Sequence, residues 1–166
     1  FKSIDFPEIA IVRDRRVRYY IEEKVSEDGP DFYTSLDPKV FVLRLIPGMN
    51  PDIFSFLKEH YDGLVIESFG VGGIPCYDNE SFVDAVADWI ACGKALVMTT
   101  QVPHEGSDMS VYMVGQVIKK KYRLIEAYDM TTEAIVAKLM WILAQTKKPA
   151  EVREMFYRPV QNDLNI

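Results

Sequence analysis

The stretch LVIESFGVGGIP, Leu64–Pro75, decides the fold that we expect for this chain. It begins with a short apolar run, Leu64–Ile66, which is typical of a strand covered on both faces. Three glycines follow at positions 70, 72 and 73. They allow backbone conformations that a Cβ atom would obstruct. We therefore predict a buried strand that ends in a glycine loop, residues 70–73.

The glycine loop is the first candidate for a ligand site. Open α/β sheets bind ligands at the carboxyl ends of their strands, where this loop is expected to lie. The plain alternative is a tight strand-to-helix connection that holds no ligand. Nucleotide binding is rejected, because a GxGxxG motif from Gly70 would need glycine where Pro75 stands, and the next helical pattern begins only near Ser81.

The composition is that of one ordinary globular domain, residues 1–166. The chain is 48% hydrophobic and 27% charged, with a formal net charge of −6, and it is long enough to form a hydrophobic core. The acidic balance argues against nucleic-acid and anionic-membrane partners. No apolar run reaches the ~18 residues of a membrane span. The basic cluster Lys119–Lys121 is interpreted as a solvated helix end.

The two cysteines, Cys76 and Cys92, form no CxxC pair. We interpret them as reduced thiols, which fits a cytoplasmic protein. No signal peptide is visible, and the chain opens with Phe1 rather than methionine. This suggests a fragment whose true N-terminus, with any targeting segment, lies elsewhere.

Strand and helix patterns alternate along the chain. After an initial loop with one helical turn at most, we predict a half-exposed strand in 13–23 and buried strands in 40–46, 64–66 and 95–99, with a short segment at 124–125. Helices are predicted after an Asn50 N-cap, in 81–91 and 110–121, in 131–145 after an Asp129 N-cap, and in 150–158. This order predicts a three-layer α/β/α sandwich with a small, mostly parallel sheet of Rossmann-like or flavodoxin-like build.

Few hydroxyl groups are placed for chemistry. Ser68, Thr99 and Thr100 end neighbouring predicted strands and could donate hydrogen bonds to a polar ligand. The local sequence supplies no base that would activate one of them as a nucleophile.

The histidines and acidic residues give no catalytic set. His104, beside Glu105 in the loop after a central strand, could reach a site, whereas His60 is interpreted as a helix-end residue. Glu67 and Asp108 could each contribute a carboxylate, although solvated or capping roles are favoured. The donors are too scattered for a metal site.

Four stretches nevertheless form a recognisable series. They are LRLIPGMNPDIF (Leu43–Phe54), IESFGVGGIP (Ile66–Pro75), TTQVPHEGSDMSVYMVG (Thr99–Gly115) and AYDMTTEAIVAKLMWIL (Ala127–Leu143). In order and spacing they resemble the C-terminal domain of bacterial and archaeal type I, cytoplasmic L-asparaginases. The likeness runs through nearly the whole chain.

The resemblance implies a two-domain amidohydrolase that converts L-asparagine to L-aspartate and ammonia without a cofactor. In that family an N-terminal domain carries the nucleophilic threonine in a TGGT-like stretch, together with a second threonine, an aspartate and a lysine. The paired threonines here, Thr99-Thr100 and Thr131-Thr132, lie in other contexts. We therefore predict that this chain holds no catalytic residue and is inactive alone.

The resemblance also implies a shared active site. In the family it lies between the N-terminal domain of one subunit and the C-terminal domain of its partner in a homo-dimer or tetramer. Ser68, Gly72 and Gly73 would then contact the amino-acid head group in trans. Relatives commonly have asparagine at the last position of a GVGN stretch, so Gly73 removes a side-chain amide contact.

An effector site is expected to be absent or altered. Some cytoplasmic members of the family bind asparagine at an allosteric site, using an arginine in LRSYG and a cysteine in LTQC. Glu67 and Val102 occupy those places here. A carboxylate in place of a cation reverses the charge offered to an amino-acid carboxylate.

Two other interpretations stay open. One is the D subunit of the glutamyl-tRNA(Gln) amidotransferase, which shares this fold and chemistry and is distinguished by an extra N-terminal region. The other is a stand-alone binding or regulatory domain of flavodoxin-like build. A receiver-type version is disfavoured, because the first buried strand ends in Pro47-Gly48 rather than in an acidic cluster.

Overall fold

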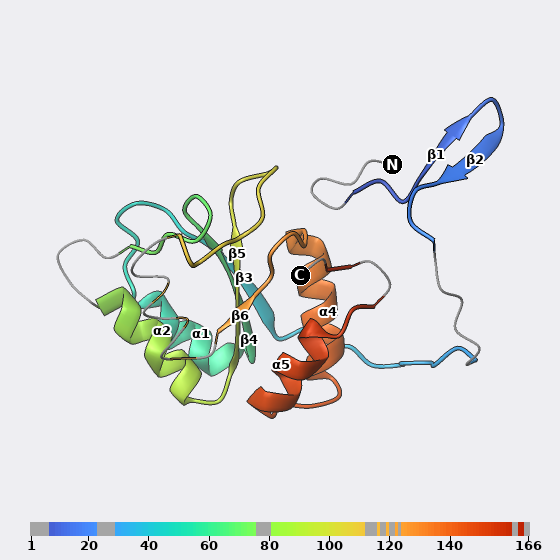
Figure 1. The fold of residues 1–166 in the computed structure, drawn as a ribbon. Coiled ribbons are helices and arrows are strands. Elements are labelled where there is room, and N and C mark those ends of the chain that lie inside the picture. The colour runs from blue at the N-terminus through green and yellow to red at the C-terminus, as the bar shows by residue number, and fades with distance from the viewer. Residues whose placement is uncertain are drawn as a thin grey trace.

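A four-stranded parallel sheet lies at the centre of the protein. The computed structural model describes residues 7–22, 29–75, 81–111, 116, 119, 122, 124–160 and 163–164. The sheet has the order β3-β4-β5-β6, formed by β3 (Val40–Arg44), β4 (Gly63–Ser68), β5 (Ala95–Thr100) and β6 (Ile125–Glu126). The strand order follows the chain order, and helices lie on both sides of the sheet (Figure 1).

Helices α1 (Ile53–His60) and α2 (Ser81–Ala91) cover one face of the sheet. Leu64 and Ile66 of β4 point to this face and pack in one buried cluster with Phe54 and Trp89 of the helices. The indole Nε1 of Trp89 donates to the carbonyl oxygen of Ala95 at 3.0 Å, so its polar atom is satisfied inside the core.

Helices α4 (Thr132–Leu143) and α5 (Pro149–Tyr157) cover the other face. Val65, which lies between Leu64 and Ile66, packs here with Leu139 and Phe156. Successive side chains of a strand point to opposite faces, so one apolar run supplies both cores. The predicted three-layer α/β/α sandwich is confirmed.

The segment that leads into β3 runs along α4. The ring of Tyr33 meets the indole of Trp141 edge-on, with centroids 5.1 Å apart, and the backbone N–H of Asp37 donates to the carbonyl of Met140 at 2.9 Å. Lys147 binds the carboxylates of both Asp37 and Asp62. These contacts explain why α4 carries apolar residues on sides that do not face the sheet.

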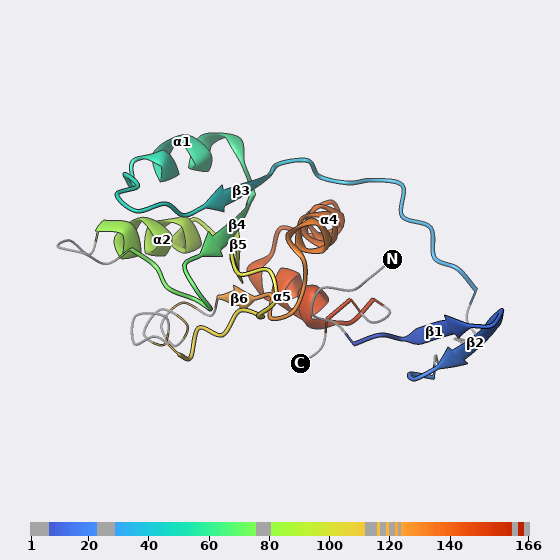
Figure 2. The same ribbon diagram turned by 90° about the horizontal axis from the view of Figure 1, so that it is seen from above.

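A hairpin precedes this segment, where one strand in 13–23 was predicted. Strands β1 (Ala10–Arg13) and β2 (Arg16–Tyr19) pair antiparallel, so β2 confirms a strand within 13–23, although it is exposed along its whole length rather than half-exposed. The prediction missed the turn at Asp14 and Arg15 and the strand β1 before it. Both turn residues have positive φ, 48° and 62°, the backbone of a type I′ turn, which usually contains glycine or asparagine. Figure 2 shows the hairpin set apart from the sheet and its helices.

Two predicted helix starts differ from the structure. The N-cap of α1 is Asp52 rather than Asn50, and the Asn50 side chain instead accepts from the backbone N–H of Asp52 at 2.9 Å. The N-cap of α4 is Thr131 rather than Asp129, with its hydroxyl oxygen accepting from the N–H of Ala134. In both places several residues able to cap stand close together, so the sequence alone does not select one.

The predicted helix 110–121 lies mostly outside the described residues. Gln116, Lys119 and Tyr122 are helical, whereas Ser110 lies in a turn. Lys119 does not belong to a solvated helix end as predicted, because it pairs with the buried carboxylate of Glu126. Lys120 and Lys121 are outside the described residues. Among the helices that the structure describes, none has both the length and the apolar character to cross a membrane.

Candidate functional site

The glycine loop follows β4 at the carboxyl edge of the sheet, where it was predicted. Phe69 and Gly73 close it by two backbone hydrogen bonds, Phe69 N–H to Gly73 O at 2.9 Å and Gly73 N–H to Phe69 O at 2.7 Å. Gly70 is exposed, with φ at 50°. The loop is therefore a compact turn with its tip open to solvent.

A second segment, residues 107–110, packs directly against the glycine loop. Gly72 has φ at 155°, and a Cβ atom there would lie 3.0 Å from the Cα of Met109. The backbone N–H of Asp108 donates to the carbonyl of Val71 at 2.6 Å. Glycine is thus required at position 72 by the close approach of the protein's own backbone.

The three predicted substrate-contact residues lie together at this edge. Ser68 is fully buried and its hydroxyl donates to the carbonyl of Thr99 at 2.7 Å, which ties β4 to β5. Gly72 is buried and Gly73 is half-buried. Gly70 is therefore the most exposed residue of the loop, with Val71 and Gly73 half-buried beside it, and contact of the three predicted residues with substrate stays a prediction.

A small polar pocket of about 230 Å³ lies between the ends of β3 to β5 and the start of α4. Both predicted effector positions, Glu67 and Val102, line it. The carboxylate of Glu67 accepts from the hydroxyl of Thr132 at 2.7 Å and lies 3.8 Å from the guanidinium of Arg44. The side chain of Glu67 is only 14% exposed, so the pocket already contains a carboxylate where an anionic effector would need a cation.

The hydroxyls at the strand ends fix the adjacent backbone by hydrogen bonds and do not form a reactive centre. Thr100 Oγ1 donates to the carbonyl of Gly70 and accepts from the backbone N–H of Val102 at 2.9 Å. Thr99 is buried. Within the described residues, the hydrogen-bond partners of the Ser68 and Thr100 hydroxyls are backbone groups, so no base activates either as a nucleophile.

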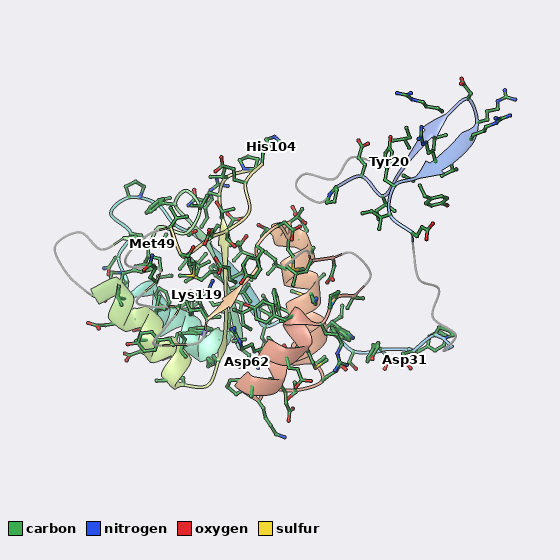
Figure 3. All side chains as sticks on the ribbon, in the orientation of Figure 1. Tyr20, Asp31, Met49, Asp62, His104 and Lys119 are labelled. Carbon is green, nitrogen blue, oxygen red and sulfur yellow. The ribbon has the colours of Figure 1, made fainter. Side chains whose placement is uncertain are left out.

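The remaining sequence candidates are dispersed. His104 lies at the tip of the loop after β5 and points away from the sheet (Figure 3), while His60 ends α1 with its ring 4.5 Å from that of Phe56. Asp108 accepts from the N–H and hydroxyl of Ser110, and these bonds lower the pKa of its carboxyl. A lowered pKa suits a capping role rather than acid catalysis at neutral pH.

Metal and thiol chemistry find little support. In the part of the chain that the structure describes, no three His, Cys, Asp or Glu side chains gather to bind a metal ion. Cys92 is an exposed free thiol, and Cys76 lies outside the described residues.

The sequence did not lead us to predict a partly buried ion pair beneath the segment 107–110. Glu126 in β6 is fully buried, and its carboxylate accepts from the backbone N–H of Met109 at 2.6 Å and from Lys119. One signal was present, because Glu126 is the single charged residue within the run Leu124–Ala127. A lone carboxylate among buried apolar residues requires a partner.

Comparison with known proteins places this geometry in a family. Residues 39–156 match the family described as the Glutaminase/Asparaginase C-terminal domain. An L-asparaginase of Thermococcus kodakarensis is 35% identical over 164 residues, which are 99% of this chain and 49% of that protein. The D subunit of the glutamyl-tRNA(Gln) amidotransferase of Thermofilum pendens is 35% identical over 123 residues, 74% of this chain and 26% of that protein.

Solved structures agree with this placement. The thermostable L-asparaginase from Thermococcus kodakarensis superposes with a TM-score of 0.88 at 34% identity, over 99% of this chain and 49% of that one. L-asparaginase I from Vibrio cholerae gives a TM-score of 0.81 over 99% of this chain and 50% of that one; at 22% identity it supports the fold alone. The chain thus spans half or less of the length of these relatives. It belongs to the glutaminase/asparaginase C-terminal domain family.

Proposed function

We propose that this chain is the C-terminal domain of an L-asparaginase, which hydrolyses L-asparagine to L-aspartate and ammonia. One observation carries the proposal: the chain is similar to the Thermococcus kodakarensis L-asparaginase along 99% of its own length and spans 49% of that protein. The similarity includes the hairpin and the segment before β3, which lie outside residues 39–156.

In this proposal the chain completes the substrate pocket and leaves the bond-breaking step to another region. The nucleophile and its base would come from an N-terminal domain, because the hydroxyls of Ser68 and Thr100 at the ends of β4 and β5 are engaged with backbone groups. Gly70 and Val71 would meet the amino-acid head group of L-asparagine from the partner subunit of a homo-dimer or tetramer. Ser68, Gly72 and Gly73 would support that surface from beneath.

The hairpin supports the proposal that an N-terminal domain is a partner. The pairs Ala10–Tyr19 and Val12–Val17 share one face of the hairpin, and Val12 and Val17 are 72% and 53% exposed. A two-stranded hairpin is marginally stable alone in water. We propose that the N-terminal domain of the same protein covers this apolar face. The protein would be cytoplasmic, as in type I enzymes.

A chimera tests the proposal. The chain is fused behind the N-terminal half of the Thermococcus kodakarensis L-asparaginase in place of that enzyme's own C-terminal half, and ammonia release from L-asparagine and L-glutamine is measured. We expect activity from the chimera and none from the 166-residue chain, with the parent enzyme as positive control. Activity of the chain alone, or a well-folded but silent chimera, would contradict the proposal.

A second candidate is the D subunit of the glutamyl-tRNA(Gln) amidotransferase. It is favoured by the 35% identity to the Thermofilum pendens protein, which equals the identity to the asparaginase. The coding sequence upstream of Phe1 separates the two. A threonine-glycine nucleophile stretch about 150 to 200 residues earlier supports either enzyme, given ordinary domain sizes. A further N-terminal region before that stretch supports the amidotransferase, and absence of the stretch supports a stand-alone regulatory domain.

A further inference from the structure

We propose that Glu126 is a positioning residue that acts through Met109 to hold the glycine loop in its binding shape. The effect on the loop stands on geometry alone. Its consequence for substrate rests on the proposed function, in which the loop meets the head group of L-asparagine.

The carboxylate of Glu126 is anchored from two directions. One oxygen accepts from the backbone N–H of Met109 at 2.6 Å, and the other accepts from the ammonium of Lys119. The backbone N–H of Glu126 donates to the hydroxyl of Tyr157 at 2.9 Å, which fixes β6 itself. Figure 3 shows Lys119 beside β6. The carboxylate therefore has a fixed position from which to orient Met109.

The backbone of Met109 and its neighbour in turn restrains the glycine loop. A Cβ atom on residue 72 would lie 3.0 Å from the Cα of Met109, so only glycine fits at position 72. The neighbouring Asp108 donates its backbone N–H to Val71 at 2.6 Å. A movement of the Met109 backbone toward the loop would collide with Gly72, and a movement away would break the bond to Val71.

Burying the carboxylate of Glu126 costs desolvation free energy that an apolar side chain would not. The Glu126 side chain is 1% exposed and that of Lys119 is 36% exposed, and a buried pair is commonly no more stabilising than apolar residues of the same volume. A carboxylate does what an apolar side chain would not, because it makes a directional, charge-assisted hydrogen bond to one backbone N–H. Burial works to lower the pKa of Lys119, but the hydrogen bond and charge of Glu126 outweigh burial and raise that pKa above its ordinary value. Lys119 thus stays a cation at neutral pH.

Amide hydrogen exchange on the 166-residue chain tests the first step. In Glu126→Ala we expect the N–H groups of Gly72, Gly73 and Asp108 to exchange about tenfold faster, since a bond to a charged group is lost. The N–H groups of Leu64 to Ile66 in β4 should keep their rates. Glu126→Gln retains an oxygen for Met109 and should give a smaller rise confined to the same loop.

A matched control uses another ion pair of the same kind. Lys138 in α4 is buried and binds Asp163 at 2.7 Å and the carbonyl of Arg158 at 3.0 Å, on the opposite face of the sheet. Lys138→Met should leave the glycine-loop rates unchanged. Should Glu126→Ala fail to fold, Glu126→Gln and Lys119→Met decide the question in the same way. Equal acceleration in β4 and in the loop, or an unaffected loop, would overturn the proposal.

The second step uses the chimera described above. Glu126→Gln should raise KM for L-asparagine several-fold and change kcat by less than about twofold, because it loosens a binding surface and not the nucleophile. A fall in kcat with unchanged KM would overturn the substrate role. An inactive chimera would count against the proposed function, and the exchange result on the loop would still stand or fall by itself.

Discussion

The central sheet and the β1–β2 hairpin both contain β-branched apolar residues but differ in what covers them. Leu64, Val65 and Ile66 in β4 are fully buried between two helical layers, whereas Val12 and Val17 of the hairpin are 72% and 53% exposed. Apolar strand residues alone therefore do not make a self-sufficient unit. The sheet takes its stability from helices within the chain, while the proposed cover of the hairpin is the N-terminal domain.

The strongest test of this difference is a pair of alanine substitutions. Leu64→Ala should lower the free energy of unfolding by about 3 kcal/mol, because it opens a cavity in a close-packed core. Val17→Ala in the same 166-residue chain should change it by less than about 0.5 kcal/mol. Urea unfolding measures both, and equal losses would show that the hairpin is packed in the isolated chain.

Val17→Ala should lower the free energy of unfolding by more once an N-terminal domain covers the hairpin. In the chimera with an N-terminal half, Val17→Ala is expected to cost about 1.5 kcal/mol, since burial of each CH₂ is worth about 0.8 kcal/mol. The measurement is the difference between the urea midpoints of the chimera with and without the substitution. A midpoint as insensitive as that of the isolated chain would refute the proposed N-terminal cover.

The ion pairs that tie the segment between the hairpin and β3 to the sheet should contribute less to the free energy of unfolding. Lys147→Met removes the cation that joins Asp37 of the linking segment to Asp62 at the start of β4, and should cost up to about 1 kcal/mol at pH 7, since Lys147 is half exposed. The control is thermal unfolding of a chain that lacks the hairpin, with and without Lys147→Met. An unchanged Tm at pH 7 would mean that Tyr33 on Trp141 anchors the segment without the ion pair.

The pH dependence of that loss has a defined sign. Burial alone would raise the pKa of both Asp37 and Asp62, but bonds and charge from Lys147 outweigh it and lower both below 3.8, helped by the backbone N–H of Lys39 at Asp37 and by Lys94 at Asp62. Their contribution is complete above pH 3.8 and is lost as the pH falls through the lowered native values. The pKa of Lys147 is raised above 10.5, so its contribution is lost only as the pH rises beyond that value. The gap between wild type and Lys147→Met should be constant near neutrality and shrink below about pH 4.

The smallest expected effect concerns a buried polar atom in the segment 107–110 that packs against the glycine loop. Among the described residues, the buried hydroxyl of Ser107 has no hydrogen-bond partner. Ser107→Ala should therefore leave the free energy of unfolding unchanged or raise it by up to about 1 kcal/mol. Ser68→Ala is the matched control, and should lower it by about 1 kcal/mol through loss of the bond to Thr99. Destabilisation by Ser107→Ala would indicate an unrecognised partner.

The layered fold could be predicted because each strand and helix of the three layers has a recognisable pattern in its own short stretch of sequence. The apolar runs at Val40, Leu64 and Ala95 and the helical spacing of Ile135 and Leu139 are visible in short windows of sequence. The hairpin could not be predicted, because Asp14 and Arg15 adopt positive φ without the glycine or asparagine that usually marks such a turn.

The location of the candidate site residues at the carboxyl edge of the sheet could be predicted, but their contacts could not. Glu67 and Val102 were singled out by resemblance, and the structure brings both to one pocket. The role of the Ser68 hydroxyl depends on the register that sets Ser68 opposite Thr100 in β5, and no local pattern encodes that register. The bond from Met109 to Glu126 likewise joins residues 17 positions apart through the tertiary fold.

The monotonic strand order also bears on how the protein is made. β3, β4 and β5, with α1 and α2 on one side, leave the ribosome before any part of α4 or α5. Until Thr132–Tyr157 has been synthesised, no helix among the described residues shields the side of the sheet that carries Val65 and Val97. A nascent polypeptide halted at that stage would present an uncovered hydrophobic face of the sheet, and such transiently exposed apolar surface favours aggregation.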